Sequence, residues 1–296
     1  MLRNALFLLL LPSAGLCQND ADVYFTPAGN YLMPEEAPMH YVLVNDLSMR
    51  AEPIATSALR STLAIGAPVR ILDASEGITT INGIRSHWYR VDDGAQQGWI
   101  WGGYIATHAF GSTSDPTVKF LAGHERIGAM VDGGSGYRYR LVALRNGTEL
   151  DRIGLRSFGH GFEDVVNLGN KGLGDIDDII ALHVPCVGGC GCSTGEVMVF
   201  WDEGRFHHAA DLIGSPDGNY SFHTAFIFPS DMEGMPGTII RVTSDVLEDD
   251  EDTEPEAEGV QRIFTKEYLR WNGNTLEPTG KRKVERKYFL QDPSAH

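Results

Sequence analysis

Three cysteines and a histidine lie close together in a glycine-rich segment and are the strongest candidates for chemistry in the chain. Cys186, Cys190 and Cys192 stand in "HVPCVGGCGCSTG", and His183 precedes Cys186 by three residues. Three thiolates and an imidazole suit tetrahedral Zn²⁺ or soft Cu(I). Structural zinc sites usually draw their ligands from two separate knuckles, whereas one loop supplies all of these. Zinc is therefore kept only as an alternative.

A disulfide is the simpler interpretation of the same cysteines. The chain opens with an export signal, described below, and exported proteins meet oxidising conditions in which thiols pair. A bond between Cys186 and Cys192 would clamp the two strands of a hairpin, whereas Cys186 with Cys190 would close only the turn. Either pairing leaves an odd thiol. We predict a disulfide, with Cys186–Cys192 as its pairing and no bound cofactor.

Cys192 also invites comparison with a catalytic nucleophile. The segment "GCSTGEVMVFW", with His207, His208 and His223 further on, loosely resembles the NlpC/P60 cysteine peptidases, whose Asp-Cys-Ser-Gly-like motif opens a helix. Gly191 stands in place of the acid, and the residues after the cysteine are β-rich. A thiolate nucleophile needs a positioned base and usually a helix N-terminus that lowers its pKa. The sequence therefore favours a protein that is not an enzyme.

Four short β-type pieces follow one another between residues 41 and 105. "LSMRAEP" alternates apolar residues and ends at Pro53, and "TLAIGAPVRIL" has a turn at Gly66 followed by Val69 and Ile71 on one sheet face. "SHWYRV" and "GWIWGGYIA" complete the series. Tight spacing of this kind is typical of strands in a small antiparallel barrel.

The order of these pieces resembles the bacterial SH3 (SH3b) family, whose repeats read as Leu, Arg and Pro near the start, a glycine turn, a "WY.V" strand and a "GW(V/I)...Y(L/I)" close. The matching residues are Leu47, Arg50, Pro53, Gly66, Trp88, Tyr89, Val91, Gly98, Trp99, Ile100, Tyr104 and Ile105. Ala51-Glu52 stand where many members have Ser-Gly. The resemblance implies a small barrel that binds cell-wall peptides or a partner domain, and it leaves the ligand open.

The aromatic residues of this segment have a structural and a functional interpretation. A domain this short needs bulky side chains for its core, so we expect Trp88 and Trp99 to be buried. Trp101 shares a face with Trp99, whereas Tyr89 points away from Trp88. We predict that Tyr89, Trp101 and Tyr104 line a ligand-binding groove for an extended peptide or glycan.

The N-terminus predicts the compartment. Arg3 precedes the apolar run "ALFLLLLPSAGLC", which is too short for a transmembrane helix but typical of a secretory signal. We assign residues 1–17 to a signal peptide and 18–38 to a linker, and expect a periplasmic or extracellular protein. Acylation of Cys17 is an alternative, although Leu16 precedes it where lipidation sites usually have a small residue.

Charge excludes some partners. The formal net charge of -16 argues against binding to nucleic acid, and no glycine-rich loop follows a strand and opens a helix, so a nucleotide is not expected. An acidic run at 245–258 lacks the glycines that curl a backbone around Ca²⁺, and we expect a solvated loop between two strands. Its acids are Asp245, Glu248, Asp249, Asp250, Glu251, Asp252, Glu254, Glu256 and Glu258.

The remainder predicts a second domain. We place the barrel at 39–110, a polar linker at Gly111 to Pro116, an antiparallel β domain at 117–290 and a tail at 291–296. Short strand-like runs separated by turns, such as Asn146-Gly147, favour a sandwich or a propeller-like fragment. The segment "GLGDIDDIIALHVPC" loosely resembles blade-like repeats of bacterial surface proteins. Its acids either bind Ca²⁺ or cap the loop before the strand; they are Asp175, Asp177 and Asp178.

Together these features predict an all-β protein in which a small SH3-like barrel precedes a larger antiparallel domain. The function expected from the resemblance is non-catalytic attachment to cell-wall peptides (peptidoglycan) or to an envelope protein. The alternative is an envelope scaffold whose β domain is stabilised by a metal or a disulfide.

Overall fold

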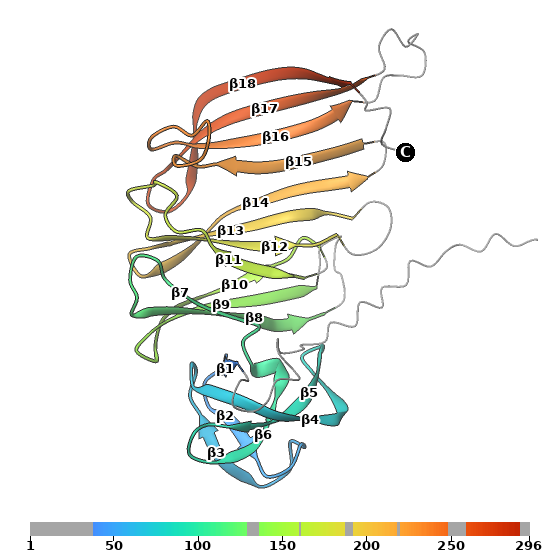
Figure 1. Cartoon of the computed structure of the whole chain (residues 1–296), viewed down its shortest axis with the longest axis vertical. Coiled ribbons are helices and arrows are strands. Elements are labelled where there is room, and N and C mark those ends of the chain that lie inside the picture. Colours follow the sequence, from blue (N-terminus) through green and yellow to red (C-terminus); the bar gives the residue numbers. More distant parts are fainter. Residues whose placement is uncertain are drawn as a thin grey trace, which may run out of the picture.

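The protein consists almost entirely of antiparallel β-sheet. The computed structural model describes residues 38–128, 136–159, 161–186, 192–217, 220–247 and 259–290. These residues form three sheets and one short 3-10 turn, η1 (Gly102–Tyr104), with the smallest domain at one end of the molecule (Figure 1). The predicted all-β class is confirmed. No helix in these ranges is long and apolar enough to cross a bilayer. The predicted signal peptide, Cys17 and the tail at 291–296 lie outside them.

The N-terminal domain is a six-stranded sheet that curls into a half-barrel. Its strands pair in the order β1-β4-β5-β6-β2-β3. They are β1 (Met39–Tyr41), β2 (Leu47–Arg50), β3 (Leu59–Leu63), β4 (Pro68–Ile81), β5 (Ile84–Asp92) and β6 (Gln97–Trp101). Alternating side chains turn inward and are removed from water, which is the main stabilising contribution in so small a unit. The core residues are Val42, Leu47, Met49, Leu63, Val69, Tyr89, Val91, Ile100 and Ile105.

The second domain begins as a sandwich of two sheets. One sheet has four strands in the order β10-β9-β8-β7: β7 (His108–Gly111), β8 (Val118–Ile127), β9 (Tyr137–Arg145) and β10 (Thr148–Arg156). Its inner face packs on strands of an eight-stranded sheet, and residues such as Phe120 and Trp201 meet at 5.4 Å between ring centroids. Of the two predicted arrangements, the sandwich is the one found in this part.

The larger sheet is a meander that continues beyond the sandwich. Its strands run in sequence order: β11 (Asp164–Asn167), β12 (Asp178–Val184), β13 (Thr194–Asp202), β14 (Arg205–Asp217), β15 (Tyr220–Ile227), β16 (Ile239–Leu247), β17 (Gly259–Trp271) and β18 (Leu276–Leu290). Because β16 pairs with β17, the acidic run connects neighbouring strands. Residues 248–258 themselves are not among the described ones.

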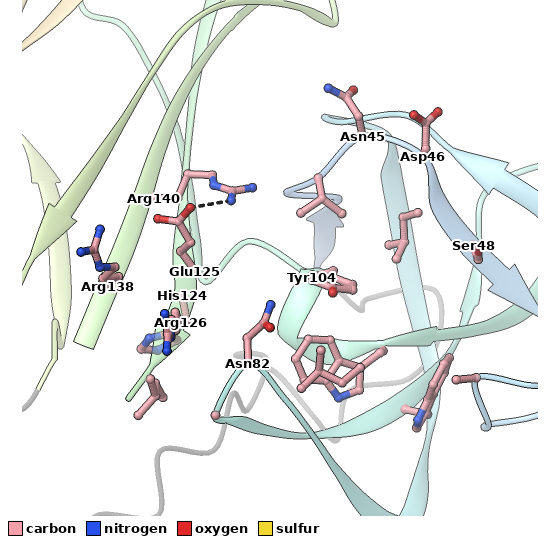
Figure 2. A pocket seen from close by; sticks show the side chains of 18 of the residues that line it. Asn45, Asp46, Ser48, Asn82, Tyr104, His124, Glu125, Arg126, Arg138 and Arg140 are labelled. Carbon is pink, nitrogen blue, oxygen red and sulfur yellow. Dashed lines mark hydrogen bonds and ion pairs between the residues drawn. The ribbon is translucent and has the colours of Figure 1, made fainter. Parts of the chain in front are cut away.

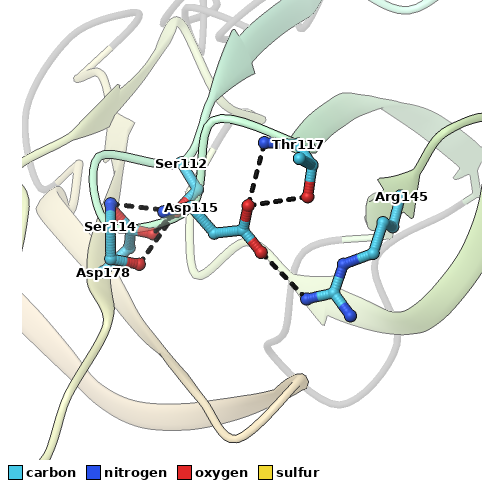
Figure 3. A network of polar contacts seen from close by, with 6 residues as sticks. All are labelled: Ser112, Ser114, Asp115, Thr117, Arg145 and Asp178. Atoms are coloured by element: carbon cyan, nitrogen blue, oxygen red, sulfur yellow. Dashed lines mark hydrogen bonds and ion pairs between the residues drawn. The ribbon is translucent and has the colours of Figure 1, made fainter.

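The boundary between the domains differs from the sequence prediction. β7 pairs with β8, so residues 108–111 belong to the second sheet and not to the barrel. The predicted linker is a turn that connects β7 to β8 and is anchored. Ser112 donates a hydrogen bond to the buried carboxylate of Asp178, and Asp115 pairs with Arg145 at 3.0 Å (Figure 3). Thr113 donates to the same carboxylate. Polar composition alone does not distinguish a free linker from a turn held by a distant acid.

The barrel packs on the outer face of β8 and β9. Leu43 and Ile65 from the barrel share a buried cluster with Leu121, Val142 and Leu144 from the sheet. The turn between β4 and β5 also reaches the end of β8, because the Ile127 N–H donates to the Asn82 carbonyl at 3.0 Å. The two domains therefore meet in an apolar contact, and the barrel leaves part of the outer sheet face uncovered.

Candidate functional site

A cleft of about 1100 Å³ lies where the barrel ends on the outer face of the second sheet. One wall comes from the barrel: the β1–β2 connection with Asn45 and Asp46, the β4–β5 turn with Asn82, and η1 with Tyr104. The other wall comes from β8 and β9 and carries arginines (Figure 2). Ligand sites in proteins are often found between domains and have volumes of this order.

Aromatic rings form the barrel side of the cleft. The rings of Trp101 and Tyr104 meet edge to face, with 4.7 Å between their centroids. The indole N–H of Trp101 donates to the Thr79 carbonyl at 3.2 Å, and that of Trp88 donates to the Thr79 hydroxyl at 3.0 Å. Both indoles are therefore satisfied internally and fixed in place. Tyr104 is half-buried, and its hydroxyl has no partner among the described residues.

The predicted groove is only partly assembled. Trp101 and Tyr104 both line the cleft, but Tyr89 lies in the barrel core with 2% of its surface exposed. Burial raises the pKa of Tyr89 to about 12. Trp101 is also almost fully covered, with 1% exposed, so Tyr104 is the predicted residue that presents an accessible ring. The three aromatics do not form one exposed face.

The second domain contributes to the burial of Trp101, whereas Tyr89 is buried within the barrel itself. Residues of β5 alternate between the barrel interior and the opposite face, and a lone barrel would leave that opposite face in water. In the protein, Trp88 and Trp101 form a cluster on that face, against which Ile127 of β8 packs. A contact between segments so distant in sequence cannot be derived from the aromatic spacing alone.

The sheet side of the cleft is rich in arginine side chains, none of which was predicted from the sequence as a site residue. Arg126, Arg138 and Arg140 line it, together with Arg50 of the barrel. Arg140 pairs with Glu125 at 2.9 Å, and Arg50 donates to the Ser57 carbonyl at 2.8 Å. The signal in the sequence was the alternation in "YRYR", which places Arg138 and Arg140 on one face of a strand.

A β-bulge positions one of these arginines. The register between β8 and β9 shifts by one residue between His124 and Arg126, so Glu125 is an extra residue on β8. A bulge of this kind re-aims the side chains that follow it. As a result Arg126 is the direct partner of Arg138. Strict alternation from His124 would have placed Arg126 on the core side.

A cluster of polar groups around the buried Tyr139 extends to the cleft, where His124 is part of the lining. The Tyr139 hydroxyl shares a hydrogen bond with the Thr107 hydroxyl and lies 3.1 Å from Nδ1 of His108. His124 packs edge-on against the Tyr139 ring at 5.2 Å. Burial, and then the nearby His108, lower the pKa of His124 to about 4. Burial also lowers the pKa of His108, opposed by Asp164, whose carboxylate lies 3.6 Å from its Nε2.

The cysteine segment holds a disulfide. Cys186 and Cys192 are bonded, with their Cα atoms 5.5 Å apart, which confirms the predicted pairing. Their sulfurs are therefore not thiolates in this structure, and Cys190 lies outside the described residues. His183 approaches Glu163 at 4.0 Å between Nε2 and Oε2. The described residues contain no group of three or more His, Cys, Asp or Glu side chains arranged to hold a metal.

The residues weighed for the hydrolase and calcium interpretations are dispersed. His207 packs against the Trp271 ring, and His208 pairs with Asp211 at 2.7 Å. Asp178 is a buried hydrogen-bond acceptor, but its donors are Ser112 and Thr113 of the β7–β8 turn and the Asn167 side chain, not the backbone of the loop before its own strand. Burial, followed by neighbouring acids, raises the pKa of Asp177.

Scans against family models and searches of curated proteins and solved structures found no match to this chain.

Proposed function

We propose that this protein is an exported, non-catalytic binding protein whose ligand occupies the cleft between the barrel and the second sheet. The observation that carries the proposal is the position of Tyr104. Its ring meets Trp101 edge to face, and the residue is half-buried and lines the cleft. A rigid aromatic of this kind loses little conformational entropy when it contacts a peptide or a sugar ring.

The resemblance of residues 41–105 to SH3b domains supports cell-wall peptides as the ligand. The hydrogen-bonding groups around Tyr104 fit such a ligand, because Asn45, Ser48 and Asn82 line the same cleft. A few polar groups around an aromatic surface are what fixes the orientation of a bound molecule. The export signal at 1–17 is the basis for placing this binding at the cell envelope.

Co-sedimentation with purified peptidoglycan tests the proposal. Tyr104→Ala should reduce the bound fraction several-fold, whereas Tyr104→Phe should retain binding if the ring face makes the contact. Leu59→Ala is the matched control, because Leu59 is 56% exposed on the same domain and does not line the cleft. Full binding by Tyr104→Ala would rule out the cleft.

A scaffold role is the second candidate, and the extended sheet favours it. Among the described residues β18 pairs only with β17, so its other edge presents backbone groups that a partner strand could pair with. If the wild-type protein does not sediment with peptidoglycan but captures a defined envelope protein, and Lys283→Pro in β18 abolishes the capture, the scaffold is the correct assignment.

A further inference from the structure

Three arginines form a row across the strands that carry the cleft. Arg126 on β8 is the direct partner of Arg138 on β9, and Arg138 is the direct partner of Arg156 on β10. Directly opposed residues of antiparallel strands point to the same side of the sheet, with Cβ atoms about 5 Å apart. The row therefore begins at the cleft wall, where Arg126 and Arg138 lie, and continues along the same sheet face.

This arrangement places like charges next to one another without compensation. Opposed like charges on a sheet are destabilising, and all three arginines are exposed. None of the three makes an ion pair or hydrogen bond with a described residue, although the chain has 40 acidic residues against 24 Lys and Arg. A protein with a net charge of -16 thus keeps, among its described residues, a row of unpaired cations beside this cleft.

Other arginines on the same sheet do form ion pairs with nearby carboxylates. Arg140 is held by Glu125 and Arg152 by Glu149. Arg145 on the same sheet pairs with Asp115, so acids are available around this sheet. Among the described arginines of the four-stranded sheet, those without a partner are the three of the row. Its guanidinium groups are free to bind an oxyanion from outside.

We propose that the Arg126–Arg138 pair, extended by Arg156, binds an oxyanion of the ligand, a carboxylate or a phosphate, while an uncharged part of the ligand lies on Tyr104. This rests on the proposed function for the position of the ligand and adds its chemical class. The planar guanidinium offers paired N–H donors that match both kinds of oxyanion. Two adjacent arginines hold such a group more tightly than one, and in this case binding also relieves their repulsion.

Fluorescence anisotropy with the full-length protein tests the oxyanion site without relying on peptidoglycan. A labelled hexaglutamate peptide is the carboxylate probe, hexaglutamine is its uncharged control, and inorganic tripolyphosphate is the competitor that reports the phosphate preference. Hexaglutamate should bind and hexaglutamine should not. Binding should weaken as salt rises, because screening shortens the reach of charges. If tripolyphosphate displaces the peptide at lower concentrations than free hexaglutamate does, phosphate is the preferred source.

The Arg126→Gln/Arg138→Gln double variant should bind hexaglutamate at least about tenfold more weakly, the loss expected for a charge-assisted contact of about 1.4 kcal/mol. Its thermal midpoint should be unchanged or higher, since a repulsion is removed. Arg205→Gln/Arg270→Gln is the matched control: it changes the net charge equally, at exposed sites outside the cleft. It should bind hexaglutamate almost normally.

Two results would overturn the oxyanion site. One is equal loss of binding in both double variants, which would indicate net charge and not the row. The other is failure of both oxyanion probes to bind. Binding of hexaglutamate through the row by a protein that does not sediment with peptidoglycan would instead support the oxyanion site and reject the wall-binding function. If the protein sediments with peptidoglycan and neither Arg126→Gln/Arg138→Gln nor salt changes the bound fraction, the wall-binding function is supported and the oxyanion site is rejected.

Discussion

Thr113 donates two hydrogen bonds to one carboxylate oxygen of Asp178, one from its backbone N–H at 2.8 Å and one from its hydroxyl at 2.5 Å. The Asn167 side-chain amide donates to the same oxygen at 2.9 Å, and the Ser112 hydroxyl donates to the other. Asp178 is fully buried. The β7–β8 turn of one sheet is therefore tied to strand β12 of the other through a single side chain.

Asp178→Ala should destabilise the protein by about 3 kcal/mol or more, because the buried carboxylate accepts four hydrogen bonds and a hydrogen bond to a charged group contributes about 1.5–3 kcal/mol. Urea unfolding followed by tryptophan fluorescence measures the loss. Asp175→Ala is the control, since Asp175 is exposed on the preceding loop, and it should stay within about 0.5 kcal/mol of wild type. A loss for Asp178→Ala as small as that of the control would show that the network contributes nothing.

The disulfide should contribute about 2 kcal/mol to stability, because it closes a short loop with a sequence separation of 6 residues. Cys186→Ser/Cys192→Ser should lower the urea midpoint by the corresponding amount, and reductant should have the same effect on wild type. Cys190→Ser should leave the midpoint unchanged and remain sensitive to reductant. If Cys190→Ser is destabilised while Cys192→Ser is not, the pairing is a different one.

The barrel was the part of the fold that sequence predicted best. Its strands are short and local, so alternation and turns at residues such as Gly66 identify them, and Gly66 does have a positive φ of 74°. The end of the barrel was misplaced because β7 is separated from β8 only by a polar turn. Whether such a turn is free or held depends on Asp178, more than 60 residues further along the chain.

The site was less predictable than the fold. The sequence identified Trp101 and Tyr104, which do line the cleft, but it placed Tyr89 beside them, whereas Tyr89 faces the barrel core and Trp88 lies on the opposite face of β5. The opposed arginines depend on the β8–β9 register and on the bulge at Glu125. A one-residue shift in register moves a side chain to the other sheet face, so spacing within one strand cannot locate such a pair.

Acidification should destabilise the protein between about pH 6.5 and pH 4 through His124. Its pKa is lowered in the folded state to about 4 from 6.5, so the unfolded chain takes up a proton first and stability falls as the pH drops. The loss is at most about 3–4 kcal/mol, at about 1.4 kcal/mol per pKa unit. Urea unfolding at pH 7.5, 6 and 5 should show a shallower pH dependence for His124→Gln than for wild type.

His208 should affect the pH dependence of folding stability in the opposite direction to His124. The hydrogen bond with Asp211 raises the pKa of His208, so protonated His208 stabilises the fold at low pH and this contribution is lost as the pH rises. Removing it with His208→Gln should make stability rise more steeply with pH than in wild type. Changes of the same sign in His124→Gln and His208→Gln would refute the assignment to individual histidines.

The contact between the barrel and the second sheet should depend on Gly83 in the β4–β5 turn. A Cβ at Gly83 would lie 1.6 Å from the Ile127 carbonyl oxygen, and its φ is +78°. Gly83→Ala should therefore push the turn away from β8, break the hydrogen bond from Ile127 to Asn82, widen the cleft and weaken ligand binding.

Gly94→Ala is the control that has only the backbone strain of a positive φ, because Gly94 has a φ of +89° and no atom close enough for a Cβ to collide with. Gly94→Ala should lose about 1 kcal/mol of stability and bind hexaglutamate normally, whereas Gly83→Ala should lose more stability and bind hexaglutamate weakly. Equal stability and equal binding in the two variants would mean that the turn does not position the cleft.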